Sequence, residues 1–75
     1  MSLEREKGSL QGQIKQILRD EITAGVWPQG ARLPPEPGLM RRFGVSRITI
    51  SQALRDLAGE GLVVRRQGKG TFVSA

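Results

Sequence analysis

The sequence of 75 residues contains no cysteine and no histidine. Without cysteine the chain can form neither disulfides nor thiolate metal sites. Without histidine it lacks the commonest general base and the commonest metal ligand. Its carboxylates do not pair on one face of any predicted helix. An enzyme is therefore the least favoured function, and we expect no catalytic residues, no metal site and no cofactor.

Aromatic residues and long apolar runs are also scarce. One Trp, two Phe and no Tyr leave no aromatic platform for stacking single-stranded bases. No apolar run approaches the ~20 residues of a membrane span, and no signal peptide is recognisable. We therefore expect a cytoplasmic protein without membrane contact, of a length suited to one small domain.

The positive charge is concentrated in the second half of the chain. Residues 1–40 hold five cationic and five anionic side chains, whereas residues 41–75 hold seven and two, so the net charge of +5 lies entirely in the second half. Six of those seven cations are arginine, whose planar fork suits phosphates and base edges. A charged surface kept only for solubility would not require this segregation, so a polyanionic partner is favoured.

The first half predicts one helix and an irregular connection. Residues 1–8 lack periodicity and are expected to form a flexible lead-in to a domain over residues 9–75. Apolar residues at helical spacing predict a helix over residues 9–24, with Ser9 as its cap and a glycine as its stop. The Pro- and Gly-rich run that follows excludes a long helix, although residues 31–33 can form a very short strand.

The second half predicts two further helices and a hairpin. One helix should begin near Glu36 or Pro37 and end at Gly44, and the next, capped by Ser46, should cover about residues 46–59. Two β-forming runs joined by the loop RRQGKG predict a hairpin. The predicted fold class is mainly α with a small antiparallel sheet, a winged helix-turn-helix with a three-helix core and a wing over residues 65–71.

The last predicted helix has two distinct faces. One face carries four apolar residues expected in the core: Ile50, Ala53, Leu54 and Leu57. In a helix-turn-helix, the N-terminal residues of the second helix contact base edges in the major groove. Arg can bind guanine, Gln can bind adenine, and Ile or the Thr methyl can contact a thymine methyl. The predicted base-reading residues are Arg47, Ile48, Thr49, Ser51 and Gln52.

The remaining polar residues of this half are candidates for phosphate contacts. Ser46 and the free N–H groups of the helix start can hold a phosphate. The sequence Gly68-Lys69-Gly70 is not a Walker A loop, because Gly70 stands where that loop needs Ser or Thr. The loop could simply need left-handed residues, but its flanking cations favour a basic wing on the backbone or in a minor groove. The predicted phosphate and wing contacts are Ser46, Arg41, Arg42, Arg55, Arg65, Arg66, Gln67, Gly68, Lys69 and Gly70.

From Ile14 to Val73 the chain resembles the winged helix-turn-helix domain of GntR-type bacterial transcription regulators. The matching segments are QIKQILRDEITAG, GARLPPE, GVSR followed by SQALRDL, and EGLV followed by RRQGKGTFV; the ending GKGTFV is most similar to the HutC branch. The resemblance implies base contact by Arg47, base or phosphate contact by Thr49, and a wing tip at Gln67 and Gly68. It also implies a homodimer on a pseudo-palindromic double-stranded DNA operator, held together by a C-terminal domain that binds a small-molecule effector and is not present in this sequence.

The second predicted helix departs from the family pattern at its start. Pro35 replaces a capping Ser, for which Glu36 is expected to substitute in part, and Gly38 removes the Glu of a capping box. Pro37 replaces an Arg that commonly contacts DNA, and Ser51 stands where many members have Arg. We therefore expect this helix to start later and to fray more than in typical members.

Two other uses of a winged helix remain as alternatives, because the fold also serves to bind RNA and proteins. The groove of double-stranded RNA that carries most base-edge information is too narrow for a helix. A protein-docking helix would be expected to show an apolar patch in place of its Arg-rich face. Sequence-specific DNA binding, as the N-terminal module of a ligand-responsive transcription regulator, is the favoured hypothesis.

Overall fold

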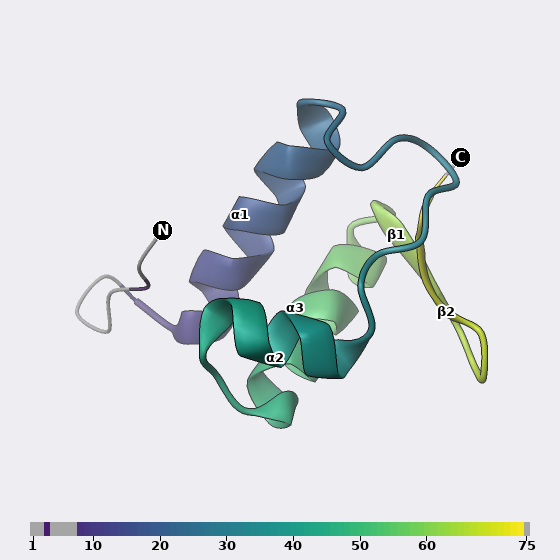
Figure 1. Cartoon of the computed structure of the whole chain (residues 1–75). Helices are drawn as coiled ribbons and strands as arrows, with labels where there is room; N and C mark the ends of the chain where they lie inside the picture. The colour runs from purple at the N-terminus through teal and green to yellow at the C-terminus, as the bar shows by residue number, and fades with distance from the viewer. Residues whose placement is uncertain (1–2, 4–7, 75) are drawn as a thin grey trace.

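The computed structural model describes Leu3 and residues 8–74 (Figure 1). The predicted lead-in over residues 1–8 thus falls mostly outside the described residues. Within them, the helices and strands in chain order are α1 Leu10–Thr23, α2 Glu36–Phe43, α3 Arg47–Gly59, β1 Val63–Arg66 and β2 Gly70–Val73. The predicted fold class, mainly α with a small antiparallel sheet, is confirmed.

Local signals at the ends of α1 and α3 explain their bounds. The Ser9 hydroxyl accepts a hydrogen bond from the Gly12 N–H at 3.0 Å, and the Ser46 hydroxyl accepts one from the Thr49 N–H at 3.3 Å. Each bond satisfies one of the N–H groups that a helix start leaves without a partner. After α3 the chain turns through Gly61 with a φ of 78°, a conformation that costs glycine little.

The start of α2 lacks such a cap. Its N-cap residue, Pro35, makes no side-chain hydrogen bond to the helix. The helix nevertheless begins at Glu36, within the predicted start near Glu36 or Pro37. The expectation that Glu36 would substitute as a cap is wrong, because both of its carboxylate oxygens bind arginines elsewhere. At the other end, Gly44 adopts the left-handed conformation with a φ of 66° and donates its N–H to the Met40 carbonyl.

The core lies between α1, α2, α3 and the base of the hairpin (Figure 1). The four apolar residues predicted for the inner face of α3 are all buried. Fully burying an Ile or Leu side chain contributes about 1.5–3 kcal/mol, so this face fixes which side of α3 points outward. The buried residues are Ile14, Leu18, Leu33, Leu39, Ile50, Ala53, Leu54, Leu57, Val63 and Val73.

The hairpin is longer than the sequence predicts. Strands β1 and β2 pair antiparallel from Val63 with Val73 to Arg66 with Gly70. Arg65, Arg66 and Gly70, expected in the loop, are therefore strand residues. Arg32 forms an isolated bridge with Phe72, so the possible strand over residues 31–33 is reduced to a single pair of residues beside β2. Because strand side chains alternate between the two faces, this extension fixes the directions in which the basic residues of β1 point.

Candidate nucleic-acid interface

The first turn of α3 presents its polar face outward. The side chain of Arg47 is 77% exposed, and Ile48 is 70% exposed. Thr49, Ser51 and Gln52 are half-buried on the same helix. All five predicted base-reading residues thus lie in the first half of α3, and Arg47 and Ile48 project furthest.

A single carboxylate connects this turn to the hairpin. Glu36, the first residue of α2, accepts a hydrogen bond at Oε1 from Arg47 Nε at 2.9 Å. Its other oxygen, Oε2, accepts one from Arg65 Nη2 of β1 at 3.1 Å. Arg65 also donates from Nη1 to the Ser51 carbonyl of α3 at 3.5 Å. The Glu36 carboxylate therefore joins α2, α3 and β1 on the outer surface, a connection that its treatment as a helix cap did not anticipate.

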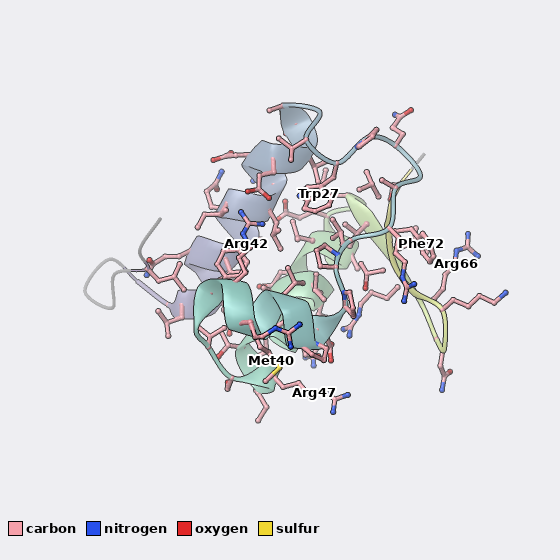
Figure 2. The ribbon with its side chains drawn as sticks, in the orientation of Figure 1. Trp27, Met40, Arg42, Arg47, Arg66 and Phe72 are labelled. Atoms are coloured by element: carbon pink, nitrogen blue, oxygen red, sulfur yellow. The ribbon has the colours of Figure 1, made fainter. Side chains whose placement is uncertain are left out.

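A groove of about 660 Å³ runs between the start of α2, the helix α3 and the hairpin. Glu36 and Arg47 line one side of it, and the glycines of the wing line the other. Four further cationic residues contribute to the lining of the groove: Arg32, Arg65, Arg66 and Lys69. Figure 2 shows Arg47 extending from α3, whereas Arg66 extends from the outer side of the hairpin, away from the helices. The excess of arginine and lysine over the one glutamate makes the groove suited to a polyanion.

Arg32 is the basic residue of this groove that the sequence analysis did not assign to DNA. A Cβ atom on Gly70 would lie 2.6 Å from Arg32 Nε, so the guanidinium lies directly against the bare glycine. Gly70 also has a φ of 125°, which L side chains rarely adopt. The possible strand over residues 31–33 was the available sequence signal, because pairing of Arg32 with Phe72 of β2 brings the Arg32 side chain next to the wing.

The tip of the wing consists of Gln67, Gly68 and Lys69, all exposed. Gly68 has a φ of 74°. Among the residues that the structure describes, neither Arg66 nor Lys69 has an ion-pair partner. Their charges are thus available to a partner outside the chain.

The predicted phosphate contacts on the helices fall into two groups. Arg41 and Arg55 are exposed, and no ion pair involves them in the described part of the chain. Arg42, in contrast, donates from Nη1 and Nη2 to the two carboxylate oxygens of Glu21. Its guanidinium lies 4.7 Å from the centre of the Phe43 ring. Figure 2 shows Arg42 directed toward α1, away from Arg47, which favours a structural ion pair over the predicted phosphate contact.

The charges of this ion pair stabilise each other. The hydrogen bond from Arg42 lowers the pKa of the Glu21 carboxyl below its usual 4.5, more than partial burial raises it. The same bond raises the pKa of Arg42. Glu21 also accepts a hydrogen bond from the Trp27 indole N–H at 2.9 Å, so this carboxylate ties α1 to both α2 and the connection that follows α1.

The family model for bacterial regulatory proteins of the gntR family matches residues 10–73. The chain belongs to the GntR family. It is 49% identical over 63 residues to an uncharacterized HTH-type transcriptional regulator, YurK, of Bacillus subtilis (strain 168), covering 84% of this chain and 26% of that protein. It is 51% identical over 61 residues to the histidine utilization repressor of Klebsiella aerogenes, covering 81% and 25% respectively. The chain thus spans about a quarter of the length of these relatives.

A solved structure supports the same assignment. The crystal structure of AraR(DBD) in complex with operator ORX1 superimposes with a TM-score of 0.89 at 38% identity, covering 96% of this chain and 87% of that one. The GntR resemblance and the winged helix-turn-helix fold expected from the sequence are therefore confirmed, and the chain is a DNA-binding domain of this family. No helix within the described residues has the length and hydropathy needed to cross a membrane.

Proposed function

We propose that this domain binds double-stranded DNA in a sequence-specific manner, with the first turn of α3 in the major groove. The observation that carries this proposal is the exposed Arg47 at the start of α3, opposite the buried Ile50 and Leu54. Its Nε is held by Glu36, and both terminal nitrogens remain for a base edge. An arginine so placed can donate two parallel hydrogen bonds to guanine O6 and N7.

In this proposal the groove and the wing supply affinity that does not depend on sequence. Arg32, Arg66 and Lys69 neutralise phosphates along one strand, and the glycines of the wing allow close approach to the backbone or a minor groove. The Ser46 hydroxyl and the free N–H groups at the start of α3 donate hydrogen bonds to a phosphate on the other side of the major groove. Arg41 and Arg55 extend the basic surface along the two helices.

The distribution of exposed apolar residues favours DNA over a protein partner. The exposed large apolar residues Val26, Ile48 and Val64 come from the connection after α1, from α3 and from β1 respectively. Isolated apolar residues of this kind are ordinary on a protein surface. Ile48, at the start of α3, is placed to contact a thymine methyl.

The whole protein is proposed to be a cytoplasmic, ligand-responsive transcription regulator that acts as a homodimer. Its C-terminal domain, not present in this sequence, would bind the effector and hold two copies on a pseudo-palindromic operator, as the family resemblance implies. One copy alone should bind weakly, with a dissociation constant that is micromolar or larger at physiological salt. Linking two copies makes the second binding event intramolecular and raises avidity by about 10²–10⁴.

Selection of bound fragments from genomic DNA, followed by titration, tests this proposal. We expect the domain to enrich fragments that share a short half-site. A dimerising coiled coil fused after Ala75 should then recover tight binding to duplexes with two half-sites, but not to duplexes with one. Absence of enrichment would contradict the DNA-binding proposal. A stable dimer of the 75 residues in sedimentation at high concentration would contradict dimerisation through the missing domain.

A further inference from the structure

We infer that Glu36 is a positioning residue for base recognition, and that Arg65 of the hairpin acts through it to orient Arg47. This inference rests on the proposed function, since it concerns how the DNA-reading arginine is aimed. Glu36 is negatively charged, like DNA, and it lies in the middle of the proposed interface. A carboxylate there needs a reason, because it repels phosphates.

The contacts show how the orientation is achieved. Glu36 Oε1 accepts the hydrogen bond from Arg47 Nε, and Oε2 accepts one from Arg65 Nη2. The side chain of Glu36 is only 19% exposed, whereas that of Arg47 is 77% exposed. The better-packed carboxylate of Glu36 therefore holds Arg47 at Nε, while the two terminal nitrogens of Arg47 stay exposed. Arg65, anchored also on the Ser51 carbonyl at 3.5 Å, keeps the carboxylate from turning away.

The atom that Glu36 binds on Arg47 determines which donors remain. A guanidinium has one N–H at Nε and two at each terminal nitrogen, in a rigid plane. Occupation of Nε by Glu36 leaves the terminal pair, which projects end-on from the helix. That pair can donate to guanine O6 and N7, whereas a guanidinium free to rotate loses entropy when it is fixed by the base. The carboxylate thus sets the angle of the fork before DNA arrives.

Stability does not account for the contact between Glu36 and Arg47. The side chain of Arg47 is 77% exposed, and an ion pair made by so exposed an arginine contributes little to the free energy of folding. The contacts are also non-local, joining the start of α2 to α3 and β1. Through Arg65 the hairpin takes part in base selection without touching a base, so the wing and the recognition helix are coupled.

The chain contains a matched control for this role. Glu60, at the end of α3, also contacts two cations, Lys15 Nζ at 2.9 Å and Arg19 Nη1 at 3.5 Å. Glu60→Gln therefore removes the same charge and weakens the same number of ion pairs away from the start of α3. In both positions glutamine keeps the shape but offers one acceptor oxygen in place of two.

The test measures dissociation constants for a duplex selected by the unmodified domain and for a shuffled duplex, with thermal unfolding of each variant. Glu36→Gln should lower the ratio of selected to shuffled affinity by roughly tenfold, part of the discrimination of one bidentate arginine. Its affinity for shuffled DNA should hold or rise, because a negative charge is lost. Glu60→Gln should leave the ratio unchanged. Arg65→Lys, which keeps the charge but cannot span Glu36 and the Ser51 carbonyl, should lower the ratio less than Glu36→Gln does.

A double-mutant cycle with Arg47→Ala separates positioning from any other effect. If Glu36 acts through Arg47, Glu36→Gln should not change selectivity further once Arg47 is removed. Equal losses on selected and shuffled DNA, or an unchanged ratio in both Glu36→Gln and Arg65→Lys, would overturn the inference. If the unmodified domain itself showed no preference, the proposed function would fail instead.

Discussion

Arg42 and Arg47 lie on either side of the turn between α2 and α3, and each binds a glutamate. Arg42 donates from both terminal nitrogens to Glu21 and stacks on Phe43, so its binding end is occupied within the fold. Arg47 donates only through Nε to Glu36, and its side chain is 77% exposed. The same pairing of arginine with glutamate thus gives a structural contact on one side of α2. On the other side it leaves the terminal nitrogens of the Arg47 guanidinium without a partner in the described part of the chain. Which nitrogen the carboxylate binds determines the difference.

Removal of Arg47 should produce the largest change in DNA recognition. Arg47→Ala is expected to cost about 1–3 kcal/mol on the selected duplex and much less on shuffled DNA, because a bidentate contact to one base is lost. Titration of both duplexes by fluorescence anisotropy measures the two costs. Equal losses on the two duplexes would reduce Arg47 to a phosphate contact and remove its contrast with Arg42.

Removal of Arg42 should give the opposite pattern. Arg42→Ala is expected to lower the free energy of unfolding by about 1 kcal/mol, since a partly exposed ion pair with good geometry and its contact with an aromatic ring are both lost. The ratio of selected to shuffled affinity should remain that of the unmodified domain. Chemical denaturation and the same anisotropy titration give the two numbers. A loss of DNA affinity with unchanged stability would show instead that Arg42 contacts a phosphate, as the sequence predicts.

Lys69 extends the comparison to a cation at the exposed tip of the wing. Lys69→Ala should weaken binding several-fold on every duplex and reduce the slope of log affinity against log salt by about 0.9, the value for one phosphate contact. Titrations at a series of salt concentrations measure the slope. If the loss were confined to the selected duplex, the wing would read sequence directly.

The ion pair between Glu21 and Arg42 should also make the stability of the domain depend on pH, which is the smallest of the expected effects. Because the pKa of Glu21 is lowered in the folded state, its contribution to stability is present above the pKa of the unfolded chain. That contribution is lost as the pH falls through the folded pKa. The unmodified domain should therefore lose more stability than Glu21→Gln between pH 6 and pH 3. Thermal unfolding of the two proteins at each pH measures these losses. Equal losses of stability in both proteins would show that the ion pair contributes nothing measurable.

The sequence predicted the parts of the fold that depend on local signals. Ser9, Ser46 and Gly44 set the ends of helices through bonds or backbone angles within a few residues. The outward face of α3 followed from the period of its apolar residues. For the same reason the predicted base-reading residues all lie on the first half of one helix.

The partners of the arginines could not be predicted in this way. Glu36 meets Arg47 and Arg65 only because the folded chain brings the start of α2 beside α3 and β1. The bond of Arg42 to Glu21 likewise depends on how α2 packs against α1. The extension of β1 through Arg66 depends on cross-strand pairing with Gly70, which offsets the low strand preference of glycine. These non-local contacts determine which of several similar arginines remain available to DNA.

Competition among three nucleic acids tests the central claim, sequence-specific binding of double-stranded DNA, most directly. The unmodified domain would be bound to a labelled selected duplex at physiological salt and titrated with unlabelled selected DNA, shuffled DNA of the same composition, and duplex RNA of the selected sequence. The account predicts that selected DNA competes at least roughly tenfold better than either of the others, as one bidentate base contact requires. Equal competition by all three would contradict it.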